Sequence, residues 1–416
     1  MPTPIGTNDT NGTNGVDSTT HVDSLLGNLM QTVCAFKTGK QERDRLAALK
    51  AAQELVRALH EPKDNVYHLV YSPTQAMCVR MRIDLEIFTS LSKSAEPVSL
   101  EDLAAVKGAS PFITERVLRI LAGIGYVEEQ DVHLYKATQM THQLTDCDSI
   151  AVVKFIYDYG MSSVAKVPEF LRKHNYQFIE GLTSGPWNYA MNREEMIWEW
   201  FSADPERLRL SNSFMEADRG SRPSWVVWCS LPGQLVKAFD GGVEDVFMVD
   251  VAGGRGHDLK SFTDKFPDVK GQFILEDLGH VLEQSVDGLR AKKIAFDLFK
   301  EQPIKGAYVY YLKFILHDWS DAQCHQILTH IREAMRPESK LIIEEFILPE
   351  KDCPMLSAMW DWEMMVFCNS FERSESHWRK VLSKAGFQAK FYYPPGDGQV
   401  RFLQSKGTFS VLTIFE

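Results

Sequence analysis

Hydrophobic and polar positions follow three different patterns along this chain. Between residues 23 and 59 leucine and other apolar residues recur at helical spacing, which predicts two helices, and a third, largely buried helix is expected around residues 75–91. Residues 126–137 alternate between apolar and polar side chains, as in a small hairpin. Beyond residue 246 the apolar residues form short unbroken runs, the pattern of buried parallel strands.

The runs in the second half of the chain predict an α/β fold with a doubly wound sheet. Helices are expected over residues 321–335 and 376–385, and the last two strands flank a Pro-Pro-Gly-Asp-Gly turn region. We expect these two strands to form an antiparallel pair at one edge of the sheet. The predicted strands are residues 247–251, 271–277, 293–299, 306–313, 340–348, 389–393 and 409–415.

A compact unit of two helices and a hairpin precedes the sheet. Ser99 opens a short helix with Asp102 three residues later, and Ser110 and a proline begin a second helix that runs to about Gly123. With the hairpin, this is a winged-helix arrangement. A DNA-binding winged helix needs a basic second helix, whereas this helix also carries a glutamate and the wing is acidic. The pattern therefore disfavours a winged-helix regulator.

The composition indicates a globular protein of two or three domains. The chain has 416 residues, of which 44% are hydrophobic and 24% charged, and no stretch reaches the roughly 18–20 apolar residues of a membrane span. The formal charge of -11 argues against a nucleic-acid partner. Seven scattered cysteines without C-x-x-C spacing favour reduced thiols, and the polar first 22 residues resemble a flexible tail more than a signal peptide. We therefore expect a cytoplasmic protein.

Three glycines directly after the strand at 247–251 predict a nucleotide-type site. Gly253, Gly254 and Gly256 allow a tight turn and a close approach of the backbone to a ligand. A dinucleotide-binding loop would have a third glycine three residues after Gly256, where Leu259 stands instead. This difference favours a ligand without a phosphate, such as S-adenosylmethionine, although an ordinary strand-to-helix turn remains possible on this stretch alone.

Acidic residues close the next two predicted strands. Glu276 and Asp277 follow the glycines at the distance expected of a ribose-binding carboxylate, and side chains on a strand alternate in direction, so only one of them is expected to reach the sugar. The pattern leaves open which one does. Asp297 closes the following run, and acids at one sheet edge suit hydroxyl and amino groups.

Two further features have both a structural and a functional interpretation. Residues 150–230 are predicted to be helical and are rich in aromatic residues, including Trp187. Most aromatic side chains in such a segment belong to the hydrophobic core. A flat aromatic substrate would also need aromatic side chains along its binding pocket. His317 follows the fourth predicted strand, where an imidazole can accept a proton from a hydroxyl near neutral pH. Taken alone, it is better interpreted as a helix-flanking or core histidine.

The order of several motifs resembles S-adenosylmethionine-dependent O-methyltransferases of the caffeic acid O-methyltransferase type, in the branch found in fungal secondary metabolism. The resemblance runs from about residue 70 to the end, and the string His-Asp-Trp-Ser-Asp from His317 is specific. The motifs are Val-Asp-Val-Ala-Gly-Gly-Arg-Gly, Glu-Asp-Leu-Gly-His-Val, Phe-Asp-Leu-Phe, Leu-Lys-Phe-Ile-Leu-His-Asp-Trp-Ser-Asp, Glu-Glu-Phe-Ile-Leu-Pro and Asn-Ser-Phe-Glu-Arg-Ser-Glu.

The resemblance implies a role for particular residues. It implies that His317 is the general base, flanked and oriented by Glu345 and Glu372. For S-adenosylmethionine it implies the three glycines near the methionine part, with Asp277, Asp297, Leu298 and Lys313 around the rest of the cofactor. It places Met365 and Asn369 in the substrate pocket, and Trp187 is our candidate for an aromatic wall. No metal is implied.

The resemblance also implies an overall organisation, with two departures from the pattern. We expect a class I methyltransferase sheet and an N-terminal winged-helix-like domain that forms a homodimer. Ala252 stands where many relatives have glycine, and Gly279 where they have proline, which puts the details of two loops in doubt. The expected segments are a tail over residues 1–22, a dimerisation domain over 23–150, a helical substrate-lining segment over 151–230 and a cofactor-binding domain over 231–416.

Two reactions remain open for such a protein. The first is methylation of a phenolic or enolic hydroxyl on a small aromatic or polyketide-like molecule. The second is a non-methylating reaction, such as a pericyclic reaction or a dehydration, in which the cofactor serves as a fixed positive charge. Relatives of the second kind tend to lose the base, so the presence of His317, Glu345 and Glu372 favours methylation.

Overall fold

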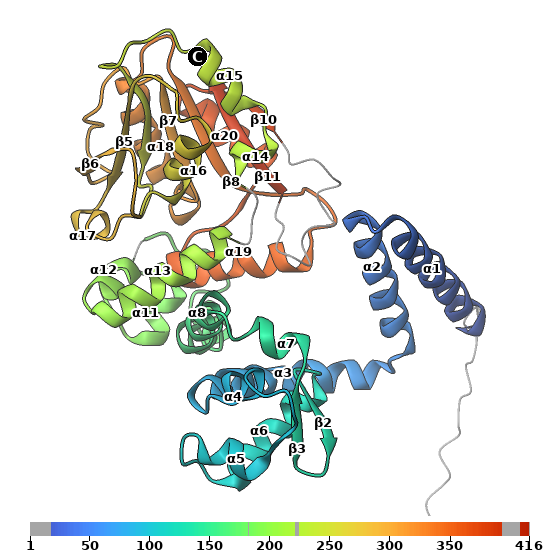
Figure 1. The fold of residues 1–416 in the computed structure, drawn as a ribbon. Coiled ribbons are helices and arrows are strands. Elements are labelled where there is room, and N and C mark those ends of the chain that lie inside the picture. The colour runs from blue at the N-terminus through green and yellow to red at the C-terminus, as the bar shows by residue number, and fades with distance from the viewer. Residues whose placement is uncertain (1–17, 182, 221–223, 393–407, 416) are drawn as a thin grey trace, which may run out of the picture. The chain divides into compact units, whose positions relative to one another are not determined.

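The computed structural model describes residues 18–181, 183–220, 224–392 and 408–415, and the chain divides into two compact units, residues 1–72 and 73–416. In the first unit α1 (Ser18–Gly39) packs against α2 (Glu42–Leu59) (Figure 1), as the leucine spacing predicted. The helix α1 begins within the segment predicted to be a tail, and the rest of that segment lies outside the described residues. Among the helices in the described ranges, none is both long and apolar enough to cross a membrane.

The helix predicted around residues 75–91 is two helices. The first, α3 (Pro62–Asp84), begins in the first unit, and α4 (Ile87–Ser92) follows after Glu86, whose φ of 52° lies in the left-handed region and ends the helical path. Of α3, only Cys78 and Arg82 are buried, so the expectation of a largely buried helix was wrong for this part. Several apolar residues of α3 are instead exposed, namely Val66, Tyr67, Leu69, Val70 and Tyr71.

The winged-helix arrangement is present at the start of the second unit. The Ser99 side chain accepts a hydrogen bond from the Asp102 backbone N–H, so it caps the first short helix as predicted. A core of apolar side chains joins the helices to a three-stranded antiparallel sheet with the strand order β1-β3-β2. The elements are β1 (Val98–Ser99), α5 (Leu100–Ala105), α6 (Pro111–Gly123), β2 (Val127–Asp131) and β3 (Leu134–Ala137).

A layer of helices follows and encloses an aromatic core. This helical layer, as we call α8 to α13 together with the later helix α19, contains Phe155, Trp187, Trp200 and Phe214 in one packed cluster. One segment, η1 (Ile156–Met161), is a π-helical turn. The helices of the layer are α8 (Cys147–Phe155), α9 (Ser162–Val164), α10 (Val167–Lys173), α11 (Pro186–Met191), α12 (Ile197–Ser202), α13 (Pro205–Gly220) and α19 (Met355–Cys368). In the sequence, α7 (Gln139–Gln143) precedes α8, and α14 (Trp225–Trp228) follows α13.

The final part of the chain forms the predicted doubly wound sheet. Its strand order is β10-β11-β8-β7-β4-β5-β6, parallel except where β11 pairs with β8 and β10, so the antiparallel pair lies at one edge as predicted. A short strand, β9 (Arg373–Ser374), pairs with β8 and was not predicted. The strands are β4 (Val246–Val251), β5 (Gln272–Asp277), β6 (Lys292–Ala295), β7 (Val309–Lys313), β8 (Lys340–Leu348), β10 (Gln388–Tyr392) and β11 (Thr408–Phe415).

Helices cover both faces of this sheet (Figure 1). Alternate residues of β7 face two separate apolar cores, because successive side chains of a strand point to opposite faces. One core includes side chains of α18 (Asp321–Ala334) and α20 (Glu375–Lys384), and the other those of α14, α15 (Leu231–Ala238) and α16 (His257–Lys265). A short helix, α17 (Gly279–Leu282), follows β5. The carboxyl ends of the parallel strands therefore meet at one edge, where ligands bind in such folds.

Candidate active site

The glycine loop between β4 and α16 forms one side of this edge. The φ angles of Gly254 and Gly256 are 62° and 85°, a region that glycine adopts without strain, and Ala252 also has a positive φ of 54°. A Cβ atom on Gly253 would collide with the carboxylate of Asp250. Side chains at these glycines would therefore strain or fill the loop, which agrees with the predicted close approach of the backbone to a ligand.

Of the two acids that close β5, Asp277 faces the glycine loop. Its carboxylate accepts hydrogen bonds of 2.7 Å from the backbone N–H groups of Gly254 and Leu278. Glu276 is fully buried, accepts a hydrogen bond of 2.8 Å from Gln302, and has its pKa raised to about 7 by burial. The geometry thus separates the two acids that the sequence pattern could not.

The other residues implied for the cofactor lie at the same edge but differ in their surroundings. Asp297 is exposed and accepts a hydrogen bond of 3.0 Å from the Phe299 N–H, and Leu298 is half-buried. Lys313 is only 6% exposed, and its ammonium group lies 2.6 Å from a carboxylate oxygen of Asp258 on α16 and 3.6 Å from one of Glu344. Lys313 therefore joins β7 and β8 to the helix that follows the glycine loop.

His317 lies in η2 (Leu316–Asp318), a single 3-10 turn that follows β7. Phe314, between strand and turn, has a positive φ of 51°, so the chain bends sharply there. The guanidinium group of Arg373, which is fully buried, donates hydrogen bonds to the carbonyl oxygens of Leu316 and Trp319 at 3.1 and 2.7 Å. These bonds fix the turn, and with it the position of the imidazole.

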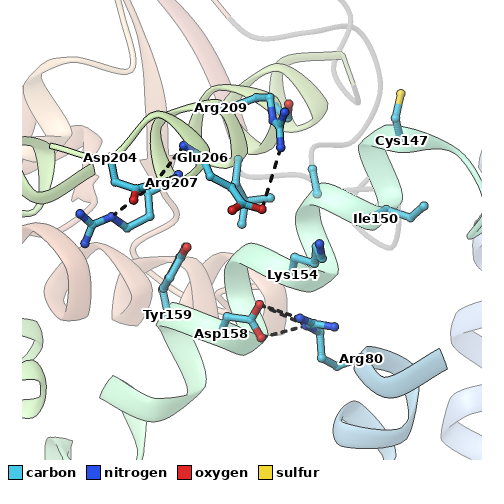
Figure 2. A pocket seen from close by; sticks show the side chains of 13 residues that line it. Arg80, Cys147, Ile150, Lys154, Asp158, Tyr159, Asp204, Glu206, Arg207 and Arg209 are labelled. Atoms are coloured by element: carbon cyan, nitrogen blue, oxygen red, sulfur yellow. Dashed lines mark hydrogen bonds and ion pairs between the residues drawn. The ribbon is translucent and has the colours of Figure 1, made fainter. Parts of the chain in front are cut away.

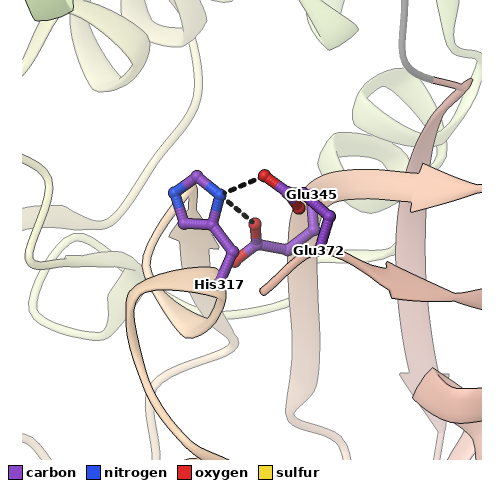
Figure 3. A group of neighbouring side chains, drawn as sticks. All are labelled: His317, Glu345 and Glu372. Carbon is purple, nitrogen blue, oxygen red and sulfur yellow. Dashed lines mark hydrogen bonds and ion pairs between the residues drawn. The ribbon is translucent and has the colours of Figure 1, made fainter. Parts of the chain in front are cut away.

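Figure 3 shows the imidazole of His317 facing two buried carboxylates. Its Nδ1 lies 2.8 Å from Oε1 of Glu372 and 3.8 Å from Oε2 of Glu345. The other oxygen of Glu345 accepts hydrogen bonds from the backbone N–H groups of Ile315 and Leu316, at 3.0 and 2.8 Å. The Glu372 carboxylate therefore sets the orientation of the ring, while Glu345 also holds the backbone of the turn.

The electrostatics of this cluster favour a proton on the imidazole. Burial alone would lower the pKa of His317, but the charges of Glu372, Glu345 and Asp318 outweigh it and raise the pKa to about 10. Burial raises the pKa of Glu345 to about 7 and that of Asp318 to about 6. One imidazole thus shares its site with three acids, two of which bind protons more tightly than usual.

The same three groups also come close enough to share a cation. One ligand atom each from His317, Glu345 and Glu372 lies within 4.8 Å of the others. The hydrogen bond from Nδ1 to Glu372 already uses two of these atoms. The geometry therefore fits an oriented imidazole without calling for a metal.

Consecutive residues of β8 contribute to both halves of this edge. Glu344 points toward Lys313 and accepts a hydrogen bond of 2.6 Å from the hydroxyl of Tyr311, whereas Glu345 points toward His317. Successive side chains of a strand face opposite sides of the sheet, so this pair follows from the strand geometry. The strand β8 thus contributes one acid to the ion pair with Lys313 and the next acid to the surroundings of His317.

The residues implied for the substrate pocket belong to the helical layer. Asn369, which ends α19 with a φ of 49°, donates hydrogen bonds to the carbonyl oxygens of Ile179 and Gly181 at 2.7 and 2.8 Å. Met365 is half-buried on α19. Trp187 is fully buried and contacts Trp200 with ring centroids 5.5 Å apart, so it belongs to the aromatic core.

A separate cavity of about 450 Å³ lies among α3, α8, η1 and α13 (Figure 2). None of the residues implied by the resemblance lines it. Its charged side chains pair with one another, for example Arg80 with Asp158 at 2.9 Å. We therefore locate the candidate active site at the sheet edge, not in this cavity.

Sequence reasoning missed several residues of the site. Asp318 was read only as part of a motif, yet its carboxylate lies 3.7 Å from Nε2 of His317. Arg373 appeared only within a quoted string, and no sequence pattern reveals that a charged residue so far along the chain is buried under the turn. The contacts depend on tertiary structure, since Glu372 and His317 are 55 residues apart.

The donor set at this edge fits S-adenosylmethionine. Asp277 offers a carboxylate to hydroxyl groups, and the left-handed glycine loop brings backbone close to a ligand. The implied residues offer acids and backbone groups, and their one cation, Lys313, is already paired with Asp258. Arg255, within the glycine loop, is paired with Glu216. A cofactor with a phosphate would instead need unpaired cations or helix N-terminal N–H groups that face it.

Comparisons with known families agree with this assignment. An O-methyltransferase domain matches residues 177–388, and an O-methyltransferase dimerisation domain matches residues 67–146. Methyltransferase cfoC of Aspergillus candidus is 31% identical over 83% of this chain and 86% of its own length. O-methyltransferase asqD of Emericella nidulans is 32% identical over 78% of this chain and 85% of its own.

Solved structures share the fold over nearly the whole chain. LepI in complex with S-adenosylmethionine has a TM-score of 0.83 at 24% identity and covers 96% of this chain and 100% of that one. OxaC in complex with S-adenosylhomocysteine and oxaline has a TM-score of 0.84 at 21% identity, with the same coverage. A pericyclic reaction enzyme has a TM-score of 0.82 at 25% identity and covers 93% of this chain and 100% of that one. The chain belongs to the O-methyltransferase family of fungal secondary metabolism and uses S-adenosylmethionine as its cofactor.

Proposed function

We propose that this protein transfers a methyl group to a phenolic or enolic hydroxyl of a small aromatic or polyketide-like metabolite, with His317 as the general base. The observation that supports this most strongly is the hydrogen bond of 2.8 Å between Nδ1 of His317 and Glu372. In a neutral imidazole this bond holds the proton on Nδ1, so the lone pair lies on Nε2. Nε2 is then the atom that accepts the proton of the substrate hydroxyl.

The raised pKa of His317 suits this reaction. Phenols ionise near pH 10, about the pKa of His317, so transfer of the proton between them is nearly balanced. In the free protein at neutral pH the imidazole holds a proton, which must leave before it acts as a base. S-adenosylmethionine supplies an electrophilic methyl group on a positively charged sulfur, and a positive charge brought to the site disfavours the imidazolium.

The remaining residues bind and position. The backbone of Gly254 and the carboxylate of Asp277 are proposed to hold the cofactor, with Gly253, Gly256, Asp297, Leu298 and Lys313 around them. Met365, Asn369 and Trp187 are proposed to border the substrate, with Asn369 fixing residues 179–181 in place. Holding nucleophile and methyl donor in line contributes most of what such a reaction needs beyond the base.

A second candidate function is a non-methylating reaction with retained cofactor. The likeness to a pericyclic reaction enzyme supports it, since the fold is shared at a TM-score of 0.82. The intact set of His317, Glu345 and Glu372 favours methylation. Mass spectrometry of the purified protein with S-adenosylmethionine and a panel of phenols separates the two. A methylated product supports methylation, whereas a rearranged product without S-adenosylhomocysteine supports the alternative.

We also propose that the protein is a homodimer built mainly through residues 23–150. The dimerisation domain matched at residues 67–146 supports this, as do the exposed side chains of Tyr67, Leu69 and Tyr71 on α3, which are 60%, 72% and 64% exposed. Light scattering at micromolar concentration tests it, and a monomeric mass would contradict it.

A further inference from the structure

The helical layer contains a half-buried acid, Glu363, one oxygen of which has no partner among the described residues. Oε2 of Glu363, on α19, is closed off from solvent and has no hydrogen-bond partner. Burial raises the pKa of Glu363 to about 7, with no cation or donor to oppose it. Buried polar atoms are nearly always hydrogen-bonded, and an ionised carboxylate without a partner opposes folding. Within the described ranges of the chain, no donor satisfies this oxygen.

The surroundings of Glu363 are aromatic and lie beside the π-helical turn. Ring atoms of Phe367 and Oε2 of Glu363 lie 3.3 and 3.4 Å from the point where a Cβ of Gly160 would stand. Glycine at 160, in η1, thus leaves room beside both groups. Single π-helical turns often occur at functional sites. Phe367 packs against Phe155 with ring centroids 5.3 Å apart, so the carboxylate lies at an aromatic wall.

Two indole N–H groups of the same layer also have no partner. Nε1 of Trp187 and Nε1 of Trp200 are closed off from solvent and make no hydrogen bond. Both belong to the aromatic cluster that contains Phe155. Oδ1 of Asn369, at the end of α19, is unpaired as well. These groups add to the hydrogen-bonding capacity that the helical layer leaves unused.

A continuous series of ring contacts links this layer to the candidate base. The ring of Phe314 lies 5.6 Å from that of His317 and 5.4 Å from that of Phe346. Phe346 lies 5.9 Å from Trp360 on α19, and Glu363 follows Trp360 by one helical turn. Packed rings thus connect the helix that carries Glu363 to the imidazole of His317.

A carboxylate among aromatic rings is the arrangement that recognises an ammonium group, because the ring faces and the acid both attract a cation. We propose that Glu363 is a specificity-determining residue that binds a protonated amine of the substrate, so that the preferred substrates are aromatic hydroxyl compounds with a basic nitrogen. This rests on the proposed function for the hydroxyl at His317. The amine forms a charge-assisted hydrogen bond with Oε2 and leaves the reacting hydroxyl free.

The test compares phenols that differ in a basic nitrogen. Calorimetry on the full chain saturated with S-adenosylhomocysteine measures the binding of tyramine against tyrosol, and of harmalol against hydroxycarbazole. We expect the amine of at least one pair to bind about tenfold tighter or more than its neutral partner, as for a hydrogen bond to a charged group. Equal affinities within both pairs, or no measurable binding of either amine, would overturn the proposal.

Variants assign the preference to this acid. Glu363→Gln should reduce the amine preference to less than about threefold, Glu363→Asp should retain part of it, and Gly160→Ala should weaken both members of a pair alike by filling space. Glu338→Gln, an exposed acid, is the matched control and should leave the preference unchanged. An amine preference that survives Glu363→Gln in a folded protein contradicts the proposal.

Two further measurements keep the outcomes distinct. Thermal melts verify that the variants fold. Above pH 7, where the native Glu363 carries its charge, Glu363→Gln should have a higher melting temperature than the native protein. At pH 4, where Glu363 is protonated, this difference should be absent. Methyl transfer is assayed separately from binding. If the amine preference holds but no methylated product forms, the proposed function fails while the role of Glu363 stands.

Discussion

The turn that carries His317 and the layer that carries Glu363 differ in how fully their acids are held by hydrogen bonds. Around His317, Nδ1 is bonded to Glu372, one oxygen of Glu345 holds two backbone N–H groups, and Arg373 fixes the carbonyl oxygens. Oε2 of Glu345 and Oε2 of Glu372 lack a hydrogen bond, as Oε2 of Glu363 does. Glu345 and Glu372, however, each use their other oxygen within the site, whereas Glu363 makes no hydrogen bond to the described residues. The imidazole is thus held in place by the chain itself, whereas we propose that a ligand completes the surroundings of Glu363.

The largest effect expected from this comparison is at the base. We predict that His317→Gln, which keeps size but removes basicity, lowers turnover by about 10²–10⁴-fold because general-base catalysis contributes that factor. Cofactor affinity should stay within about threefold. Product formation by mass spectrometry and calorimetry with S-adenosylmethionine measure the two. Near-normal methylation would exclude the assignment, and conversion without cofactor consumption would favour the pericyclic alternative.

The next effect concerns the acid that orients the ring. The free-enzyme profile of kcat/KM should rise with pH as His317 loses its proton, toward a limb near pH 10. Glu372→Gln removes a negative charge at 2.8 Å, so the imidazolium is less stable and the limb should move to lower pH by about 1–3 units. A limb that stays in place belongs to the substrate hydroxyl, whose pKa the substitution does not change.

A smaller effect is expected at the glycine loop. Asp277→Ala removes the carboxylate proposed to hold the ribose, and we predict that binding of S-adenosylmethionine weakens by about tenfold or more, near 1.4 kcal/mol. Glu276→Gln serves as the control because that side chain faces the core and bonds to Gln302. Calorimetry decides the matter, and tight binding of NAD to the native protein would refute the cofactor assignment.

The smallest expected effect concerns Ala252, which stands where many relatives have glycine. An L-residue at a φ of 54° is strained by about 1–2 kcal/mol, and glycine relieves this but loses more entropy on folding. Ala252→Gly should therefore change the free energy of unfolding by less than about 1 kcal/mol, in the stabilising direction. Denaturant unfolding measures it. A loss of stability above that size would show that the methyl group packs usefully.

The sheet and the positions at its edge followed from local patterns, whereas the contacts within the site did not. Apolar runs such as that of β8 and capping signals such as that of Ser320 are short-range, so strands and helix starts were predictable. The roles of Glu345 and Glu372 came from the family resemblance alone, because only folding brings them to His317. Neither the helix α19 nor the π-helical turn η1 was predicted. The missing partner of Oε2 of Glu363 is apparent only in the three-dimensional structure.

The adjacent acids of β8 have a consequence for how such a protein can change. Glu344 and Glu345 serve opposite faces of one strand, so the gain or loss of a single residue upstream within β8 would exchange both acids at once. The ion pair of Glu344 with Lys313 and the contact of Glu345 with His317 would then be lost in the same event. Insertions in this strand therefore cannot tune one activity and spare the other. Divergence toward new chemistry has to proceed by replacement, one side chain at a time.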